Sequence, residues 1–214
     1  MSVLVRVFPL GLLKSNVYLV YEEETREAMI IDAGGGSQYV MREIRKEGLK
    51  PKFILLTHGH FDHTFELADF REVLKVEAYI HKEDVWTLET LWDSGLSIFG
   101  LKMPRPSINK YFEGEPSFKF GSQLVKVIHT PGHTPGSVCY FLSDASMLFT
   151  GDTLFQGSIG RTDLPGGNPS LMKKSLKKLL SLDDEVVIYP GNGPRTTMGK
   201  ERKSNPFLLD LDSS

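Results

Sequence analysis

Three histidines and one aspartate fall within six residues of this chain, directly after a short apolar run. Segment 57–63 reads Thr-His-Gly-His-Phe-Asp-His and follows four apolar residues, a run whose length is typical of a buried strand. Imidazole and carboxylate groups are ligands for zinc, iron and manganese. In an extended loop His58 and His60 lie on the same side, whereas Asp62 and His63 turn toward an adjacent position. The segment therefore predicts a metal site at the end of a buried strand.

Two further segments place single ligand groups where an apolar strand is expected to end. His133 lies in the Pro- and Gly-rich turn 130–136, and Asp152 follows Gly151 after an apolar run. Alone, His133 would more often be structural, and Asp152 would be a turn or helix-cap residue. Together with the first segment they add a third imidazole and a carboxylate whose two oxygens can bridge two metals. All these groups would then meet at one edge of the fold.

The other histidines and the single cysteine carry weaker signals. The whole chain has only six histidines, so a surface loop rich in histidine by chance is a poor explanation of segment 57–63. His129 lies at an expected strand end, and we interpret it as structural or as a support for the ligands. His81 has no companions and is expected to be exposed or hydrogen-bonded. Cys139 lies within an apolar strand and is expected to be a small core residue.

The order of elements predicts an α/β fold, an αββα sandwich in which two sheets pack face to face with helices outside. The length fits one domain spanning residues 1–214. Helices are expected at 37–46, with Ser37 as the cap, at 65–74 and at 169–180, and Thr197 would cap a short terminal helix. Strands are expected at 3–8, 17–21, 28–31, 53–56, 76–80, 123–128, 138–142, 147–150 and 186–189.

Residues 93–116 show little periodicity and contain three prolines. Long connections of this kind often serve as lids or pocket walls. We therefore expect a substrate pocket to form from this segment and from the loop 155–165. The aromatic and apolar side chains considered for the first wall, with plain core packing as the equal alternative, are Trp92, Phe99, Met103 and Tyr111.

Composition excludes several kinds of partner. The chain has 25 Lys and Arg against 27 Asp and Glu, a formal net charge of −2, which disfavours binding to nucleic acid or to an anionic membrane. The N-terminus has no signal-peptide pattern, and no apolar run approaches the length of a membrane span. A single cysteine fits a reducing compartment. These features favour a cytoplasmic protein with a small-molecule substrate, and nothing in them indicates an oligomeric state.

These motifs, taken in order, resemble the metallo-β-lactamase fold superfamily over nearly the whole chain. The resemblance begins at Ser15–Val20, continues through Ile31–Gly34 and the two histidine segments, and extends to the tail 189–208. Within the superfamily, the runs Gly151–Phe155 and Gly160–Pro165 are similar to glyoxalase II and its short relatives. Those enzymes hydrolyse thioesters of glutathione, so the resemblance implies a metal-dependent thioesterase.

The resemblance also implies roles for individual residues. One metal would be held by His58, His60 and His133, and a second by Asp62 and His63, with Asp152 bridging them. Zinc is the expected ion, in one or two copies, with iron or manganese as alternatives. The metals would activate a hydroxide for attack on the thioester carbonyl, and Asp62 would orient it as a catalytic residue. The leaving thiolate needs little protonation because thiols have a pKa of about 8.5.

Two features depart from the family pattern. The family has a last histidine where this chain has Asn192, in Pro-Gly-Asn-Gly-Pro at 190–194. An amide oxygen is a weaker ligand than imidazole for these metals, so we hypothesise that the second metal binds more weakly. Glyoxalase II also carries a helical C-terminal domain that grips glutathione, and this chain resembles the short bacterial and archaeal members that lack it.

Other readings of the same motifs remain open. A persulfide dioxygenase would use one iron held by His58, His133 and Asp152. A non-catalytic metal-binding protein is a second alternative. A β-lactamase is disfavoured because that family usually has Cys at position 152, and a diiron flavoprotein because it has Glu at position 60. A tRNA-processing nuclease is disfavoured by the net charge, since the basic run 173–178 is expected to be a solvated helix face.

Overall fold

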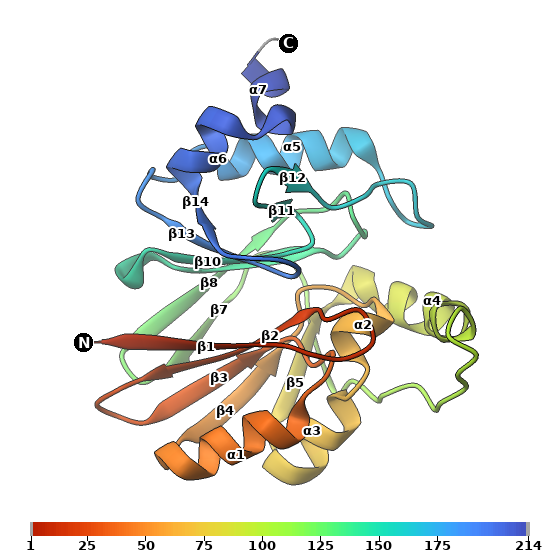
Figure 1. Cartoon of the computed structure of the whole chain (residues 1–214), viewed down its shortest axis with the longest axis vertical. Helices are drawn as coiled ribbons and strands as arrows, with labels where there is room; N and C mark the ends of the chain where they lie inside the picture. The colour runs from red at the N-terminus through yellow and green to blue at the C-terminus, as the bar shows by residue number, and fades with distance from the viewer. Residues whose placement is uncertain (1, 213–214) are drawn as a thin grey trace.

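The strands form two six-stranded sheets that pack face to face (Figure 1). The computed structural model describes residues 2–212. Strands β1 to β3 of the first sheet run antiparallel and β3 to β6 run parallel. In order across that sheet they are β1 (Val3–Pro9), β2 (Asn16–Glu22), β3 (Glu27–Ile31), β4 (Lys50–Leu55), β5 (Glu77–His81) and β6 (Lys110–Phe112).

The second sheet is also mixed, because β10 and β13 pair in parallel while its other neighbours are antiparallel. A small separate hairpin consists of β11 (Leu154–Phe155) and β12 (Ser158–Ile159). In order across the second sheet the strands are β14 (Thr196–Thr197), β13 (Val187–Pro190), β10 (Met147–Gly151), β9 (Val138–Leu142), β8 (Gln123–His129) and β7 (Ser117–Phe120).

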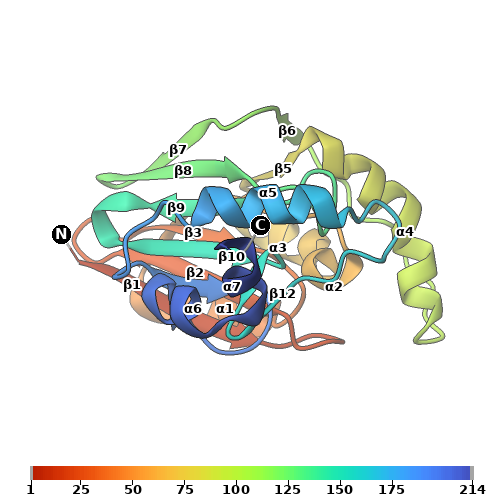
Figure 2. The same cartoon turned by 90° about the horizontal axis from the view of Figure 1, so that it is seen from above.

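Helices cover the outer faces of both sheets, which confirms the αββα sandwich (Figures 1 and 2). The first sheet carries α1 (Ser37–Glu47) and α3 (Leu67–Leu74), and the second carries α5 (Pro169–Leu179), α6 (Met198–Ser204) and α7 (Pro206–Asp212). Helices α2 (Phe61–Thr64) and α4 (Val85–Ser97) lie at one end of the sandwich. Single 3-10 turns cover Lys82–Asp84 and Ser143–Ala145.

Strand β2 shows why the sheets stack in this way. Its residues alternate between two apolar clusters: Val17, Leu19 and Tyr21 pack under the helices of the first sheet, and Tyr18 and Val20 pack between the sheets. All five are buried. Burial of one such aliphatic side chain stabilises the fold by about 2 kcal/mol, so a strand apolar on both faces belongs inside a layered fold.

The expected strands agree with the structure to within a few residues, but one expected cap is wrong. Ser37 is the first residue of α1, and Gly36 occupies the cap position with a φ of 74°. The Ser37 N–H donates to the carboxylate of Glu66 at 2.7 Å, so a distant side chain satisfies the helix end. The expected cap of α6 is confirmed, because the Thr197 hydroxyl accepts from the N–H of Lys200.

The long connection expected at 93–116 is shorter in the structure. Helix α4 extends to Ser97 and β6 occupies Lys110–Phe112. Leu88, Trp92 and Leu96 are its buried apolar residues and recur every four residues. The helix also carries apolar residues on its other faces, which hides the periodicity that would reveal it. None of the helices in the described part of the chain is both long and apolar enough to cross a membrane.

Candidate metal centre

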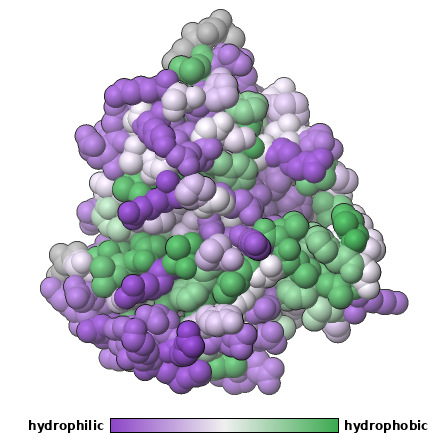
Figure 3. Space-filling view, in the orientation of Figure 1, coloured by the Kyte–Doolittle hydropathy of each residue, from purple (hydrophilic) through white to green (hydrophobic). Residues whose placement is uncertain are grey.

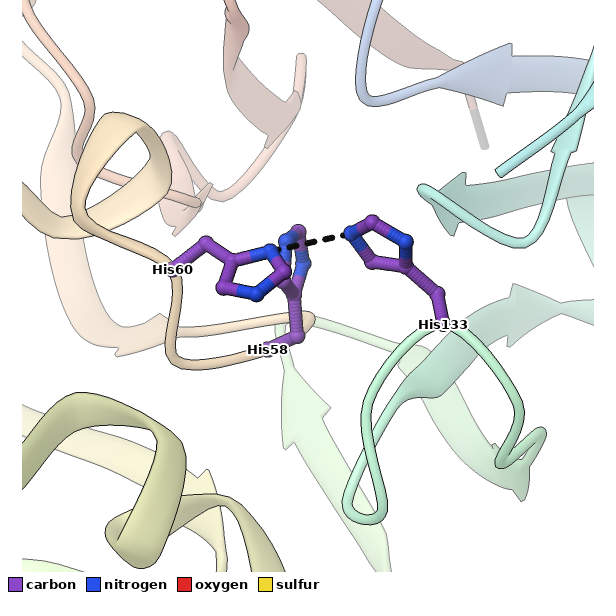
Figure 4. Close-up of side chains that lie close together, drawn as sticks. All are labelled: His58, His60 and His133. Carbon is purple, nitrogen blue, oxygen red and sulfur yellow. Dashed lines mark hydrogen bonds between the residues drawn. The ribbon is translucent and has the colours of Figure 1, made fainter. Parts of the chain in front are cut away.

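Three histidines from two distant loops point toward one another at one end of the sandwich (Figure 4). His58 and His60 follow β4, and His133 follows β8. All three are buried, and each offers a ring nitrogen within 4.8 Å of the others. Nδ1 of His60 lies 3.0 Å from Nε2 of His133. The structure therefore brings together the first ligand group expected from the sequence.

A second group adjoins the first and shares His58 with it. Ligand atoms of His58, His63 and Asp152 lie within 4.8 Å of one another. Nε2 of His63 lies 3.4 Å from a carboxylate oxygen of Asp62 and 3.4 Å from Oδ1 of Asp152. The other oxygen of Asp152 lies 3.6 Å from Nε2 of His133. Asp152 thus contacts both groups through different oxygens, as a bridging carboxylate would.

The hydrogen bonding of these rings fits a metal. Among the described residues, Nε2 of His58, His60 and His63 is buried without a hydrogen-bond partner, an arrangement that normally costs free energy. The other ring nitrogen of His58 contacts the Thr57 hydroxyl at 3.0 Å, and that of His63 contacts Asp32 at 2.8 Å. Partners at the second nitrogen are what orient a ligating histidine. The donor set is therefore suited to divalent metals.

The electrostatics of the site give its residues different charges. Burial and the neighbouring imidazoles lower the pKa of His58 well below its usual value and that of His60 to about 3. Burial also lowers the pKa of His63, but Asp62, Asp152 and Asp32 outweigh it and raise the value well above the usual one. For Asp152, burial raises the pKa, and the histidines lower it to about 2. Neutral imidazoles beside an ionised carboxylate are the forms that bind metal, so His58, His60 and Asp152 are already in that form, whereas His63 would release a proton on binding a metal.

Asp32 supports the site, although the sequence reasoning gave it no role of its own. It follows β3 in a left-handed conformation with φ of 60°. Its carboxylate accepts from the N–H and hydroxyl of Thr57 and contacts Nδ1 of His63. Asp32 therefore fixes the start of the His58 loop and the ring of His63 together. Its signal in the sequence was its place after an apolar strand, the same signal that marked Asp152.

Asp84 is a second supporting residue that the sequence reasoning missed. It is fully buried and lies at the start of α4. One carboxylate oxygen accepts from the N–H of Gly59 and the other accepts from the N–H of Gly136 at 2.7 Å. Gly59 separates two ligands of the first group, and Gly136 belongs to the turn of His133. Asp84 therefore ties the two ligand loops to each other.

Asn192 lies beside the second ligand group, as its position in the sequence predicts. Its Nδ2 donates to Oδ1 of Asp152 at 3.2 Å. The neighbouring Gly191 N–H donates to the carbonyl of Gly151 at 2.7 Å, and the Gly191 carbonyl accepts from the N–H of Asn16 at 2.7 Å. The segment that carries Asn192 is thus held against two strand ends, and the amide presents a donor rather than a ligand oxygen to Asp152.

Four of the candidate ligands, His60, Asp62, His133 and Asp152, line a cavity of about 610 Å³. The loop 155–165 forms part of its wall, as expected, through Phe155, Ile159, Arg161, Leu164 and Pro165. Another part of the wall comes from α4 and the residue after it, partly within the expected segment 93–116, but not through the four side chains considered for it. The residues that line this part are Leu91, Ser94, Gly95 and Ile98.

The four side chains considered for that wall lie elsewhere. Trp92 is buried on the inner face of α4, and its Nε1 donates to the carbonyl of Met103. Phe99, Met103 and Tyr111 are exposed and lie outside the cavity lining. Core packing was thus the correct alternative for Trp92.

The other histidines and the cysteine stay outside the centre. His129 ends β8 and stacks on His81, with ring centroids 4.3 Å apart and an angle of 18° between the planes. Lone pairs of nearly parallel rings do not converge, so the proximity of Glu83 does not make this pair a good metal site. His81 is buried rather than exposed, and its Nδ1 accepts from the N–H of Glu83. Cys139 is a buried core residue, as expected.

The fold and the ligand order together define a family. The sequence profile of the metallo-beta-lactamase superfamily matches residues 10–191, and the chain belongs to that superfamily of metal-dependent hydrolases.

Relatives that cover nearly all of the chain agree with this assignment. The chain is 36% identical to a probable metallo-hydrolase, YqgX, of Bacillus subtilis over 95% of this chain and 96% of that one. It is 35% identical to the hydroxyacylglutathione hydrolase GloC of Haemophilus influenzae over 95% of this chain and 97% of that one.

Solved structures show the same fold over the same extent. BLEG-1, a B3 metallo-beta-lactamase, is 38% identical with a TM-score of 0.89, over 96% of this chain and 99% of its own. TTHA1623 in a di-iron-bound form is 38% identical with a TM-score of 0.84, over 95% of this chain and 100% of its own.

Proposed function

We propose that this chain is a metal-dependent thioesterase that hydrolyses S-acyl-glutathione-type thioesters. The observation that carries the proposal is the pair of adjoining ligand groups that Asp152 links beside a cavity. The likeness to GloC supports the substrate class. Zinc in one or two copies is the proposed metal, with iron and manganese as alternatives. The proposal also includes a cytoplasmic location and a small-molecule substrate, without nucleic acid or membrane.

The proposed metals would be held by His58, His60 and His133 on one side and by Asp62 and His63 on the other, with Asp152 between them. When bound, such metals polarise a carbonyl and supply a nucleophile at neutral pH. The side chains of the protein must then position the thioester and accept one proton.

Asp62 is the residue that we propose accepts that proton. Its side chain lines the cavity, and its Oδ2 accepts from the Ser15 hydroxyl at 2.6 Å. With Oδ2 fixed by Ser15 and by the contact to His63, the carboxylate has a set orientation toward the ligand cluster. It can accept a proton from the attacking water at this position. The thiolate leaves without needing a strong acid, because thiols have a pKa of about 8.5.

The cavity walls suit the uncharged part of a thioester. Leu91 of α4 and Ile98, which follows that helix, line the cavity together with Phe155, Ile159 and Leu164 of the loop 155–165. Apolar walls around a few polar groups are typical of small-molecule sites. A thioester could lie between them with its carbonyl toward the ligand cluster.

A mononuclear iron persulfide dioxygenase is the second candidate, and the Asn192 contact favours it. Because position 192 holds Asn, whose amide donates to Asp152, the proposed second metal has one strong ligand fewer than in the family pattern. A single iron at His58, His133 and Asp152 would present the two-histidine, one-carboxylate face of oxygen-activating enzymes.

The test is metal analysis of the purified protein followed by assays with three substrates. We expect hydrolysis of S-lactoylglutathione by the metal-loaded protein, with His58→Ala and His133→Ala inactive and His81→Ala active. Oxygen uptake with glutathione persulfide would favour the dioxygenase instead. Hydrolysis of a cephalosporin would favour the activity named for BLEG-1. If the protein turns over none of these substrates after loading with zinc, iron or manganese, a non-catalytic metal-binding protein is favoured.

A further inference from the structure

A second cavity, of about 900 Å³, opens beside the metal centre. It lies along β1, at the free edge of the first sheet, and reaches the segment 192–195. Leu13 and Asn192 line both cavities, so the two cavities adjoin at these residues. Figure 3 shows a hydrophobic band over β1 that continues toward α4.

The groove along β1 has an apolar floor and only cationic charge. Val3, Val5 and Val7 lie at alternate positions of β1 and face into it. The only charged residues among the described ones that line it are Lys14 and Arg195. Neither forms an ion pair with another described residue. Two unpaired cations in one groove are notable on a chain of net charge −2.

The backbone fixes the positions of the two segments that carry these cations. Lys14 is held in a left-handed conformation with φ of 59°. Two residues later, Asn16 donates its N–H to Gly191 and its Nδ2 to the carbonyl of Gly193 at 2.9 Å. The segments that carry Lys14 and Arg195 are therefore tied to each other next to Asn192.

We propose that the groove along β1 holds the distal part of the substrate, and that Lys14 and Arg195 bind carboxylates on it. This inference rests on the proposed thioesterase function and specifies its substrate: an acyl thioester whose thiol part carries anionic groups. The reacting carbonyl would lie at the ligand cluster, and the thiol part would pass Leu13 and Asn192 into the groove. Arg161, the cation of the first cavity, is less suited, because Asp163 already binds it with two contacts of 2.8 and 2.7 Å.

The experiment compares two thioesters that share the acyl group. S-lactoylglutathione carries two carboxylates, and the lactoyl thioester of N-acetylcysteamine carries none. Exposed ion pairs contribute about 1 kcal/mol at most, so Lys14→Ala and Arg195→Ala should each raise KM for the first substrate about fivefold, with kcat unchanged. The KM of the second substrate should stay the same. Arg195→Lys should restore most of the loss, and Lys119→Ala, an exposed cation on β7, serves as the matched control.

Two further measurements distinguish substrate binding from a purely structural role: the dependence of KM on ionic strength and the direct binding of glutathione. KM for S-lactoylglutathione should rise with ionic strength in the parent protein and much less in the double variant. Equal changes in KM for both thioesters, or no change for either, would overturn the inference while leaving the thioesterase function intact. If no thioester is hydrolysed, the proposed function fails. Calorimetric titration with glutathione then decides the inference: about fivefold weaker binding by each variant supports it, and unchanged or absent binding overturns it.

Discussion

The amide nitrogen of Asn192 donates to the carboxylate of Asp152 over 3.2 Å. This contact lies where the family pattern has a metal-ligating histidine. Because the amide offers a donor to a carboxylate that already contacts both ligand groups, it stabilises Asp152 without adding a ligand. The proposed second metal is left with Asp62, His63 and Asp152 as its ligands. The two metal positions are therefore expected to differ in affinity.

Replacing Asn192 by histidine should make the two affinities more alike. An added imidazole would supply the missing ligand, and even loss of a residue that only supports a ligand typically costs about 10- to 100-fold in metal affinity. We expect the parent protein to keep about one metal per chain after gel filtration against a weak chelator. Asn192→His should keep about two. Atomic emission analysis of both proteins measures this directly.

Asn192→Ala is the matched control for that comparison, since it removes the contact to Asp152 without adding a ligand. It should hold no more metal than the parent protein. Two equally tight metals in the parent protein and in Asn192→His would show that Asn192 does not weaken the second position.

Asp32 should matter for metal affinity although it is not expected to ligate. It contacts Nδ1 of His63 and fixes Thr57, which in turn contacts His58. Loss of such a supporting carboxylate typically costs 10- to 100-fold in metal affinity. Asp32→Asn should therefore release its second metal at a chelator concentration about tenfold lower. Asp144→Asn, at an exposed turn, is the control, and equal release by both variants would contradict the role given to Asp32.

The sequence predicted which candidate ligands the fold brings together, because each follows an apolar strand. His58, His133 and Asp152 come from segments far apart in the chain, yet the strand ends that carry them meet at one edge of the sandwich. Short apolar runs in the sequence are therefore enough to predict where such residues lie in the fold. The same logic applied to Asp32 would have found it, since it follows β3.

Residues that act through distant backbone groups could not be predicted in this way. The role of Asp84 depends on Gly59 and Gly136, 25 and 52 residues away, and nothing near it in the sequence marks them. The segment 93–116 does contribute to the cavity wall, but the side chains expected there were wrong for a related reason. The apolar residues of α4 lie all round the helix, so only packing decides that Trp92 faces the core and Leu91 faces the cavity.

Asp84→Asn should weaken the hydrogen bonds that hold the two ligand loops together. Both carboxylate oxygens accept from backbone N–H groups, so an amide of the same size must turn its own N–H toward one of them. A buried donor without a partner costs about 1–3 kcal/mol. We expect lower stability to urea and weaker binding of the first metal, held by His58, His60 and His133. Asp93→Asn, on the exposed side of α4 and paired with Arg105, should change neither.

Metal titration of Asp84→Asn at a temperature where it is fully folded separates the two effects. If the variant is less stable but binds metal like the parent protein, Asp84 supports the fold only and does not position the ligands.

Glu22 links the two sheets far from the metal centre, and its effect on stability should depend on pH. It is buried at the end of β2 and accepts from the N–H and hydroxyl of Ser122, the hydroxyl of Thr25 and the amide of Gln123. These hydrogen bonds, that of Ser122 above all, lower the pKa of Glu22 from 4.5 to about 2. Because the folded-state pKa is the lower one, the stabilisation is complete above pH 4.5 and is lost as pH falls toward 2.

Glu22→Gln should therefore cost about 2 kcal/mol of unfolding free energy at pH 7, and the difference from the parent protein should shrink between pH 4.5 and 2. Urea unfolding at pH 7, 4 and 3 measures this. Glu24→Gln, in the exposed turn after β2, is the control and should match the parent protein at every pH. A Glu22→Gln deficit that stays constant down to pH 3 would mean that the amide fits the site poorly for reasons other than charge.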